Sequence, residues 1–273
     1  MREFKTLTVA RTGQVATVAL KQPPYVQGAN IHWEIGSLFS EMREDDSVRV
    51  IILTGTDDVF TTPSPKTTYD DPEWPNRALD PKKIWHTFTG MIRSHQAMAE
   101  IEKPIIARVN GDAIGLGSSL CFACDLIVAR EDAVIMDSHM GATFDGIYGT
   151  TRKIGGHDWS NVPGDGGSSL IPLFMTPCKA KEYLMLAKPY SAAELARMGV
   201  INYAVPAAEL DSKVDDLVEQ LLSKGAYALA RTKRMANARV VDQLNRTLDA
   251  SAGYEIVTEM QLFLRPHDVQ SLG

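Results

Sequence analysis

The chain has 273 residues, of which 44% are hydrophobic and 23% charged, the composition of an ordinary globular protein with a sizeable core. Its formal net charge of −6 argues against a protein that binds nucleic acid through a basic face. No apolar run approaches the roughly 20 residues that cross a bilayer, and the opening residues, MREFKTLTVA, lack the apolar core of a signal peptide. We therefore expect a cytoplasmic protein with no nucleic-acid or membrane partner.

The first half of the chain alternates between short apolar strands and helices. Strand and helix in repetition indicate βαβ units and an α/β fold. A long loop rich in Pro and Thr interrupts this pattern, and long loops in compact domains are often functional. The predicted elements are a hairpin over Thr6–Leu20, a helix over Ile31–Met42, a strand over Val48–Leu53, the loop over Thr61–Pro81, a helix over Pro81–Ile101, a strand over Pro104–Val109, a helix from Leu116 and a strand over Leu126–Ala129.

The second half changes character after Asp137, where a Gly-rich stretch runs through Gly167. Helical periodicity dominates beyond it. We expect a core domain over residues 1–205 and a helical C-terminal region over residues 206–273. The predicted helices are Lys179–Ala187, Ala192–Met198, Leu210–Lys224 and a long run from about Ala226 to Leu264.

The segment V-P-G-D-G-G, Val162–Gly167, places a single carboxylate inside a turn. Proline presets one backbone dihedral and glycine adopts positive φ at little cost, so this segment can bend sharply. Asp165 is either a turn-forming residue or a side chain held in place for chemistry. The residues alone leave both interpretations open.

Patterns for nucleotide, metal or redox chemistry are weak. Cys121 and Cys124 have the spacing of a redox or zinc pair, but no second pair completes a zinc site and their surroundings are apolar. We expect both to be small core residues. No phosphate-binding loop of the G-x-x-x-x-G-K-S/T type is present. A basic run, R-T-K-R over Arg231–Arg234, is expected to lie on a solvated helix face. The sequence therefore predicts no cofactor and no metal.

Several segments, in the right order and spacing, resemble the crotonase (enoyl-CoA hydratase/isomerase) superfamily. They are V-R-V-I-I-L-T-G, K-P-I-I-A-R-V-N-G-D-A-I-G-L-G, A-C-D-L-I-V-A-R-E-D-A, V-P-G-D-G-G and S-A-A-E-L-A-R-M-G-V-I-N-Y-A-V-P. The resemblance covers nearly the whole chain. It implies an α/β fold with a crotonase-type ββα spiral core and a helical C-terminal trimerisation region, assembled as a homotrimer or a dimer of trimers.

The same resemblance implies an oxyanion hole made of two backbone N–H groups. One donor falls at Leu116, in a Gly-Leu-Gly turn before a helix, and free N–H groups at a helix start suit that task. The other falls at Ser64, in F-T-T-P-S-P, where the flanking prolines depart from the family pattern. Both residues are therefore predicted oxyanion donors.

The two glutamates of the family's hydratases have no counterpart in this chain. Their positions read Gly117-Ser118-Ser119 and Ser138-His139. Adding water across a double bond requires a base for the water and an acid for the α-carbon. The sequence therefore argues against ordinary enoyl-CoA hydration by the usual route.

A better match is the branch of 6-oxocamphor hydrolase and related β-diketone hydrolases. That branch's catalytic Asp falls at Asp165 and its Asp-paired His at His139. A His of its early helix falls at His32, and a Glu of its C-terminal helix falls at Glu255. One further family His has no counterpart, and Leu116 stands near its position.

An insertion between His139 and Asp165 adds two further candidates. T-F-D-G-I-Y-G resembles a motif of the dihydroxynaphthoyl-CoA synthase branch, which makes Asp145 a rival for the catalytic acid. G-G-H-D-W-S-N contributes His157, a candidate for the missing imidazole.

These features favour a hydrolase that cleaves a carbon–carbon bond of a β-diketone by a retro-Claisen route. His139, oriented by Asp165, would activate water, and the Leu116 N–H would receive the enolate oxygen. His32 and Glu255 would line the site of this small-molecule ketone. Two alternatives stay open: a CoA-thioester enzyme of the enoyl-CoA hydratase/isomerase type, and a non-catalytic crotonase-like subunit.

Overall fold

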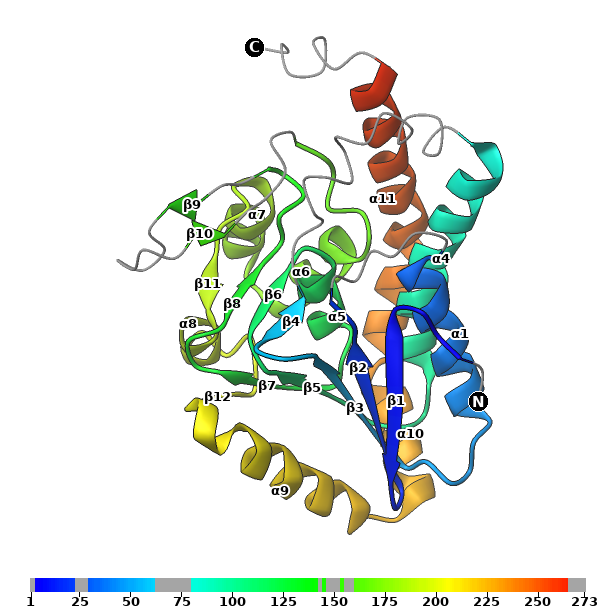
Figure 1. The fold of residues 1–273 in the computed structure, drawn as a ribbon, viewed down its shortest axis with the longest axis vertical. Helices are drawn as coiled ribbons and strands as arrows, with labels where there is room; N and C mark the ends of the chain where they lie inside the picture. The colour runs from blue at the N-terminus through cyan, green and yellow to red at the C-terminus, as the bar shows by residue number, and fades with distance from the viewer. Residues whose placement is uncertain are drawn as a thin grey trace.

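The computed structural model describes residues 3–22, 29–61, 80–141, 144–145, 153–154 and 160–264, with no side-chain placement for 144–145, 153–154 and 262–264. Two sheets and the helices around them form the α/β fold that the sequence predicts (Figure 1). The strands are β1 Leu7–Thr12, β2 Val15–Leu20, β3 Val50–Gly55, β4 Val59–Thr61, β5 Ile105–Val109, β6 Asp112–Ile114, β7 Leu126–Arg130, β8 Val134–Met136, β9 Phe144–Asp145, β10 Lys153–Ile154, β11 Tyr190–Ser191 and β12 Tyr203–Val205. The helices are α1 Ile31–Arg43, α4 Pro81–Glu100, α5 Leu116–Phe122, α6 Gly167–Phe174, α7 Pro177–Met185, α8 Ala192–Arg197, the 3₁₀ turn η2 Ala207–Glu209, α9 Leu210–Leu222, α10 Ala226–Ala236 and α11 Ala238–Leu264.

The larger sheet has six strands in the order β1-β2-β3-β5-β7-β12. Only the β1–β2 hairpin is antiparallel, and the other neighbours pair in parallel. The smaller sheet has the order β11-β8-β6-β4, parallel except for the β11–β8 edge. Strand β4 follows β3 directly, as β6 follows β5 and β8 follows β7, so the chain moves repeatedly from the first sheet to the second.

Strand β3 shows why the large sheet is covered on both faces. Its residues V-I-I-L-T-G are all buried, as expected for a parallel strand between two layers. Successive side chains point to opposite faces. Ile51 and Leu53 join the main core, whereas Val50 and Ile52 pack with residues of α9. Helix α9 therefore covers the outer face of the sheet (Figure 1).

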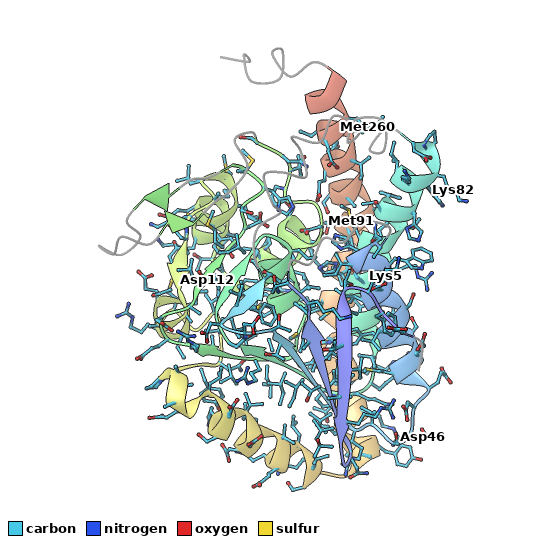
Figure 2. All side chains as sticks on the ribbon, viewed as in Figure 1. Lys5, Asp46, Lys82, Met91, Asp112 and Met260 are labelled. Carbon is cyan, nitrogen blue, oxygen red and sulfur yellow. The ribbon has the colours of Figure 1, made fainter. Side chains whose placement is uncertain are left out.

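A helical layer lies along one flank of the core, where α4 packs against both α1 and α11 (Figure 1). Met91 on α4 forms a small apolar cluster with Ala252 and Ile256 of α11, and the partly buried Met260 packs against this cluster. Figure 2 labels the two methionines. Helix α11 also packs against α6. The last helix is thereby fixed to the core near the segment that carries Asp165.

Most sequence-predicted elements are confirmed, with one break. The long C-terminal run divides into α10 and α11 around Asn237, whose side chain donates to the carbonyl of Ala99. Cys121 and Cys124 are buried in the core, as predicted. The basic run is only partly solvated: Lys233 is buried and forms a 2.7 Å ion pair with Asp125. The loop over Thr61–Pro81 lies outside the described residues except at its ends. No described helix is both long and apolar enough to cross a bilayer.

Candidate active site

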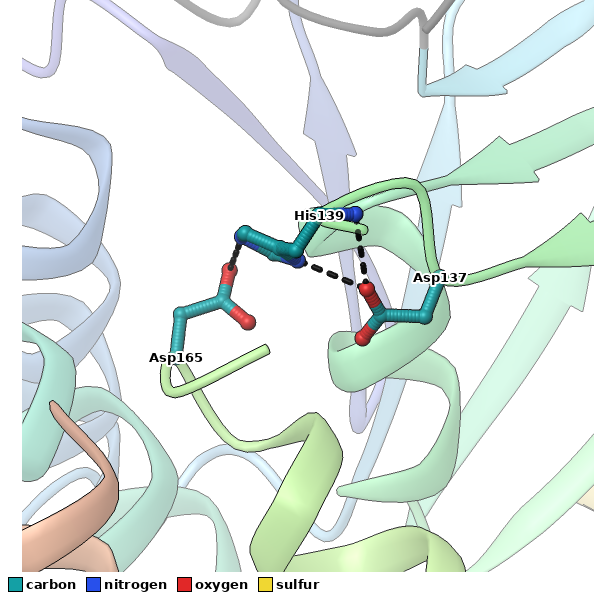
Figure 3. Close-up of side chains that lie close together, drawn as sticks. All are labelled: Asp137, His139 and Asp165. Carbon is teal, nitrogen blue, oxygen red and sulfur yellow. Dashed lines mark hydrogen bonds and ion pairs between the residues drawn. The ribbon is translucent and has the colours of Figure 1, made fainter. Parts of the chain in front are cut away.

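A hydrogen-bonded Asp–His pair lies just after β8. Oδ1 of Asp137 accepts a 2.7 Å hydrogen bond from Nδ1 of His139 and a 3.1 Å bond from the backbone N–H of the same residue (Figure 3). The second bond closes a local turn, because an Asp side chain commonly accepts from the backbone N–H two residues further on. Because a carboxylate accepts only, Nδ1 carries a proton and Nε2 points to the other side of the ring.

Two more carboxyl groups face Nε2 of His139. Oδ2 of Asp165 lies 3.8 Å from it and Oε1 of Glu255 lies 3.7 Å from it (Figure 3 shows the first of these). These separations are those of ion pairs rather than direct hydrogen bonds. Asp165 comes from the turn before α6 and Glu255 from α11. Three distant segments of the chain therefore meet at one imidazole.

The sequence predicted that Asp165 orients His139, and the structure gives that hydrogen bond to Asp137 instead. His139 and Asp165 do converge, but through the opposite ring nitrogen. Asp137 is a residue of this cluster that the sequence did not predict. The signal that could have found it is the spacing, since an Asp two residues before a His readily bonds that residue's backbone N–H.

The turn that bears Asp165 is held from three sides. Ser119 on α5 donates a 2.9 Å hydrogen bond to Oδ1 of Asp165. A Cβ at Gly164 would lie 2.2 Å from the carbonyl oxygen of Ser251, so this glycine permits α11 to approach. Gly166 has φ +119°, and a Cβ there would lie 2.3 Å from Nε2 of His95. The V-P-G-D-G-G segment is therefore a fixed support for the carboxylate rather than only a turn.

His95 on α4, a residue of which the pattern of the helix suggests only a surface position, is fully buried. Helix α4 is covered by other helices on two sides, and the face with His95 meets the Asp165 turn. Nδ1 of His95 donates to the carbonyl of Met91 at 3.0 Å, because a carbonyl can only accept. Nε2 is then unprotonated, and it has no hydrogen-bond partner among the described residues.

His32 also lies at the site, near the start of α1. It is buried, and its Nδ1 has no hydrogen-bond partner among the described residues. Burial lowers its pKa to about 4, although the charge of Asp165 acts in the opposite direction. Burial likewise lowers the pKa of His95. Both imidazoles are therefore neutral near pH 7.

The surroundings of His139, Asp165 and Glu255 shift the pKa values of these three groups in different directions. Burial opposes a charge on His139, yet Asp137, Asp165 and Glu255 together raise its pKa well above the usual value. Burial also opposes the charge of Asp165, but His139 outweighs it and lowers the Asp165 pKa. For Glu255, burial is the larger effect and raises the pKa well above its usual value. The directions of these pKa shifts favour an imidazolium at His139, the ionised form of Asp165 and the protonated form of Glu255.

The predicted oxyanion donor Leu116 is the first residue of α5. It follows Gly115, which has φ +59°, and no described residue accepts from its N–H. A Cβ at Gly115 would lie 3.1 Å from Oγ of Ser138, so this turn adjoins the segment that carries His139. Ser64 and His157 lie outside the described residues, and so does the side chain of Asp145.

Asp137, His139 and Asp165 are the described residues whose donor atoms could also gather around a metal ion, all within 4.8 Å. Two ligands of one ion at about 2.0–2.2 Å are usually more than 3 Å apart. The 2.7 Å contact between Nδ1 and Asp137 is instead a hydrogen bond. The donor set fits an acid–base cluster better than a metal centre.

Comparison with known proteins places this chain in a family. The family model described as enoyl-CoA hydratase/isomerase matches residues 11–261. The chain belongs to the enoyl-CoA hydratase/isomerase family. It is thus a crotonase-family enzyme, and its α/β fold is the crotonase fold.

Relatives in the family differ in the reactions that their names state. A probable mitochondrial enoyl-CoA hydratase of Dictyostelium discoideum is 28% identical over 240 residues, 87% of this chain and 77% of that protein. A carnitinyl-CoA dehydratase of Escherichia coli K12 is 26% identical over 235 residues, 85% of this chain and 80% of the relative.

Two solved structures illustrate how widely the fold is shared. An enoyl-CoA hydratase/isomerase from Mycobacterium paratuberculosis has a TM-score of 0.79 at 22% identity, covering 96% of both chains. A β-diketone hydrolase from Anabaena sp. PCC 7120 has a TM-score of 0.76 at 21% identity, covering 95% of this chain and 96% of that one. At such identities the likeness extends to the fold and not to the reaction.

Proposed function

We propose that this enzyme adds or removes water, or shifts a double bond, beside the carbonyl of a CoA thioester. Asp165 acts as the base and Glu255 as the acid. The observation that carries this proposal is the convergence of two buried carboxyl groups on one ring nitrogen: Asp165 lies 3.8 Å and Glu255 3.7 Å from Nε2 of His139. Their surroundings shift the two carboxyl pKa values in opposite directions, down for Asp165 and up for Glu255. A pair of carboxyl groups held in opposite protonation states is what acid–base catalysis at neutral pH requires.

Asp165 and Glu255 supply the two carboxyl groups that the hydratase positions of this chain lack. Ser119 and His139 occupy the two positions of the hydratase glutamates, and both contact Asp165. Ser119 donates a hydrogen bond to Oδ1 of Asp165, and Nε2 of His139 faces Oδ2. The V-P-G-D-G-G turn thus supplies a carboxylate between the two substituted positions. Glu255 supplies the second from α11. Acid and base are both available, from segments other than those of the usual hydratases.

In this mechanism the ionised Asp165 takes a proton from water as the water oxygen attacks the β-carbon of the enoyl group. The electrons move to the thioester carbonyl, and the N–H of Leu116 stabilises the enolate oxygen. Glu255 then gives its proton to the α-carbon. Dehydration follows the same steps in reverse. His139 stabilises the charged form of Asp165 before it takes the proton, and Asp137 keeps the ring of His139 in place.

A panel of enoyl-CoA and 3-hydroxyacyl-CoA thioesters of different chain types would test this proposal. We expect turnover of at least one thioester, reduced by two or more orders of magnitude in Asp165→Asn and in Glu255→Gln, the range typical of a lost acid or base. Asp249→Asn, which removes an exposed carboxylate of α11, is the matched control and should retain activity. Absence of turnover across the panel, together with no retention on immobilised CoA, would contradict the proposal.

Hydrolysis of a β-diketone is the second candidate, favoured by the Asp137–His139 hydrogen bond. A neutral His139 in this tautomer could take a proton from water through Nε2. The water oxygen would attack one carbonyl, the central carbon–carbon bond would break, and Glu255 would protonate the departing enolate carbon. However, the three carboxyl groups around His139 favour its protonated form, which cannot act as that base.

The two candidates predict different behaviour of His139→Gln. If His139 is the base of a hydrolase, loss of cyclic or linear 1,3-diketone absorbance should cease in this variant. If Asp165 is the base in a thioester enzyme, His139→Gln should retain part of the activity, and wild type should leave the diketones intact. The homotrimer or dimer of trimers implied by the family stays a prediction that sedimentation can measure.

A further inference from the structure

Helix α11 carries a second acid one turn beyond Glu255. Glu259 follows at i+4, and residues four apart lie on the same helix face with Cβ atoms about 5–6 Å apart. Glu255 is buried, whereas Glu259 is only half buried. The spacing and the burial therefore place Glu259 one helical turn from Glu255 and nearer the surface.

Glu255 has an atom available for such a line. Its Oε1 faces His139, while its Oε2 is buried and has no hydrogen-bond partner among the described residues. A buried carboxyl oxygen without a partner is costly unless it serves a purpose. Oε1 of Glu255 thus faces the imidazole of His139, whereas Oε2 makes no hydrogen bond to the described residues.

The proposed reaction creates a need for proton movement at Glu255. Each hydration leaves Glu255 without its proton and leaves Asp165 with an extra one. The acid must regain a proton before the next turnover, and the buried site separates it from bulk water. A group that reaches both Glu255 and solvent would meet this need.

We propose that Glu259 carries protons between Glu255 and solvent. This inference rests on the proposed role of Glu255 as the acid. The protonated carboxyl of Glu259 gives its proton to the carboxylate of Glu255, and the resulting Glu259 carboxylate takes a proton from hydronium or a buffer acid. One O–H bond breaks and one forms at each transfer. The proton that Asp165 took from water returns to solvent before the next turnover, so one proton enters through Glu259 and one leaves from Asp165 in each hydration.

The electrostatics of Glu259 suit this task. Burial raises its pKa to about 7, and the charge of His139 opposes that rise. The charged groups that face it are His139 across the site and Glu255 on the same helix. A relay exchanges protons fastest when its pKa lies near the working pH, because both of its forms are then populated. Glu259 therefore holds and releases protons readily at neutral pH.

The test measures proton exchange directly and does not depend on the substrate. In protein labelled with ¹⁵N-histidine, NMR gives the exchange rate with water of the ring N–H protons of His139, assigned with His139→Gln. The Nε2 proton faces Glu255. At low buffer concentration we expect Glu259→Gln to slow its exchange at least tenfold. Added imidazole, a small buffer with a pKa near 7, should restore the rate. Asp249→Asn should leave it unchanged.

Two results would overturn the relay. One is an unchanged exchange rate in Glu259→Gln; the other is a slowed rate that imidazole does not restore, which indicates a change of structure instead. The outcome is separable from that of the proposed function. If exchange is slow in Glu259→Gln and imidazole restores it, but no thioester is turned over, the relay is supported and the proposed function is refuted. If thioesters are turned over in a reaction that requires Glu255, but exchange in Glu259→Gln is normal, the proposed function is supported and the relay is refuted.

Discussion

Replacing Ser119 by alanine tests the charge of Asp165 directly. Ser119 and Asp165 are both buried, and the 2.9 Å bond between them is the hydrogen bond that the described structure shows to Oδ1. The variant removes one hydroxyl and leaves a buried carboxylate oxygen without a donor. Its effect should therefore depend on whether Asp165 is charged.

The expected magnitude follows from the cost of that bond. A hydrogen bond to a charged group is worth about 1.5–3 kcal/mol net. At 1.36 kcal/mol per pKa unit, its loss raises the pKa of Asp165 by about one to two units. The same ~1.5–3 kcal/mol should be lost from the free energy of unfolding near pH 7. The pKa of Asp165 is lowered in the folded state, so this contribution is full above the usual Asp value of 3.8 and fades as the pH falls below it.

Urea unfolding at neutral and at acidic pH would measure the effect, with Ser118→Ala as the matched control. Ser118 is the neighbouring buried serine on α5, but its hydroxyl bonds that of Tyr183 at 2.6 Å, a neutral pair. We expect the loss in Ser119→Ala to shrink in acid and that in Ser118→Ala to stay constant. Equal, pH-independent losses in both variants would refute the view that Asp165 is ionised in the folded protein.

Three further predictions concern other parts of the structure. Gly166→Ala should cost about 1–3 kcal/mol and lower activity, because φ is positive and the new Cβ would meet His95; chemical denaturation measures the first effect, and Gly225→Ala, with open space around it, is the control. Lys233→Met should cost about 3–5 kcal/mol in urea unfolding by leaving Asp125 without its buried partner, and a loss no larger than that of an exposed lysine would contradict this. The raised pKa of His139 adds stability that is full below pH 6.5 and is lost as the pH rises through the folded-state pKa, so the unfolding free energy of wild type should fall in alkali more than that of His139→Gln.

The strands and helices could be predicted because local pattern and tertiary environment agree. The run V-I-I-L predicts a buried strand and forms β3, and Pro81–Ile101 predicts a helix and forms α4. The break at Asn237 could not be predicted in the same way. Alanine and charged residues on both sides favour helix, and the end of α10 depends on a tertiary hydrogen bond from Asn237 to the carbonyl of Ala99.

The sequence predicted which residues come together better than it predicted the hydrogen bonds between them. His32, His139, Asp165 and Glu255 come together as the resemblance implied. The turn after β8 determines that Asp137, rather than Asp165, accepts the hydrogen bond from Nδ1 of His139. The sequence does not specify the backbone dihedral angles of this turn. The burial of His95 depends on how α4 lies against the Asp165 turn, and periodicity alone does not distinguish one polar residue on a helix from another.

The position of Glu255 on the final helix has a consequence for the making of the enzyme. Glu255 reaches the Asp165 turn only when α11 packs against Gly164, where the hydroxyl of Ser251 donates to the Gly164 carbonyl. Under the proposed mechanism, a chain in which α11 has not yet packed would hold the base without the acid. Such a chain would be inactive even with both sheets formed.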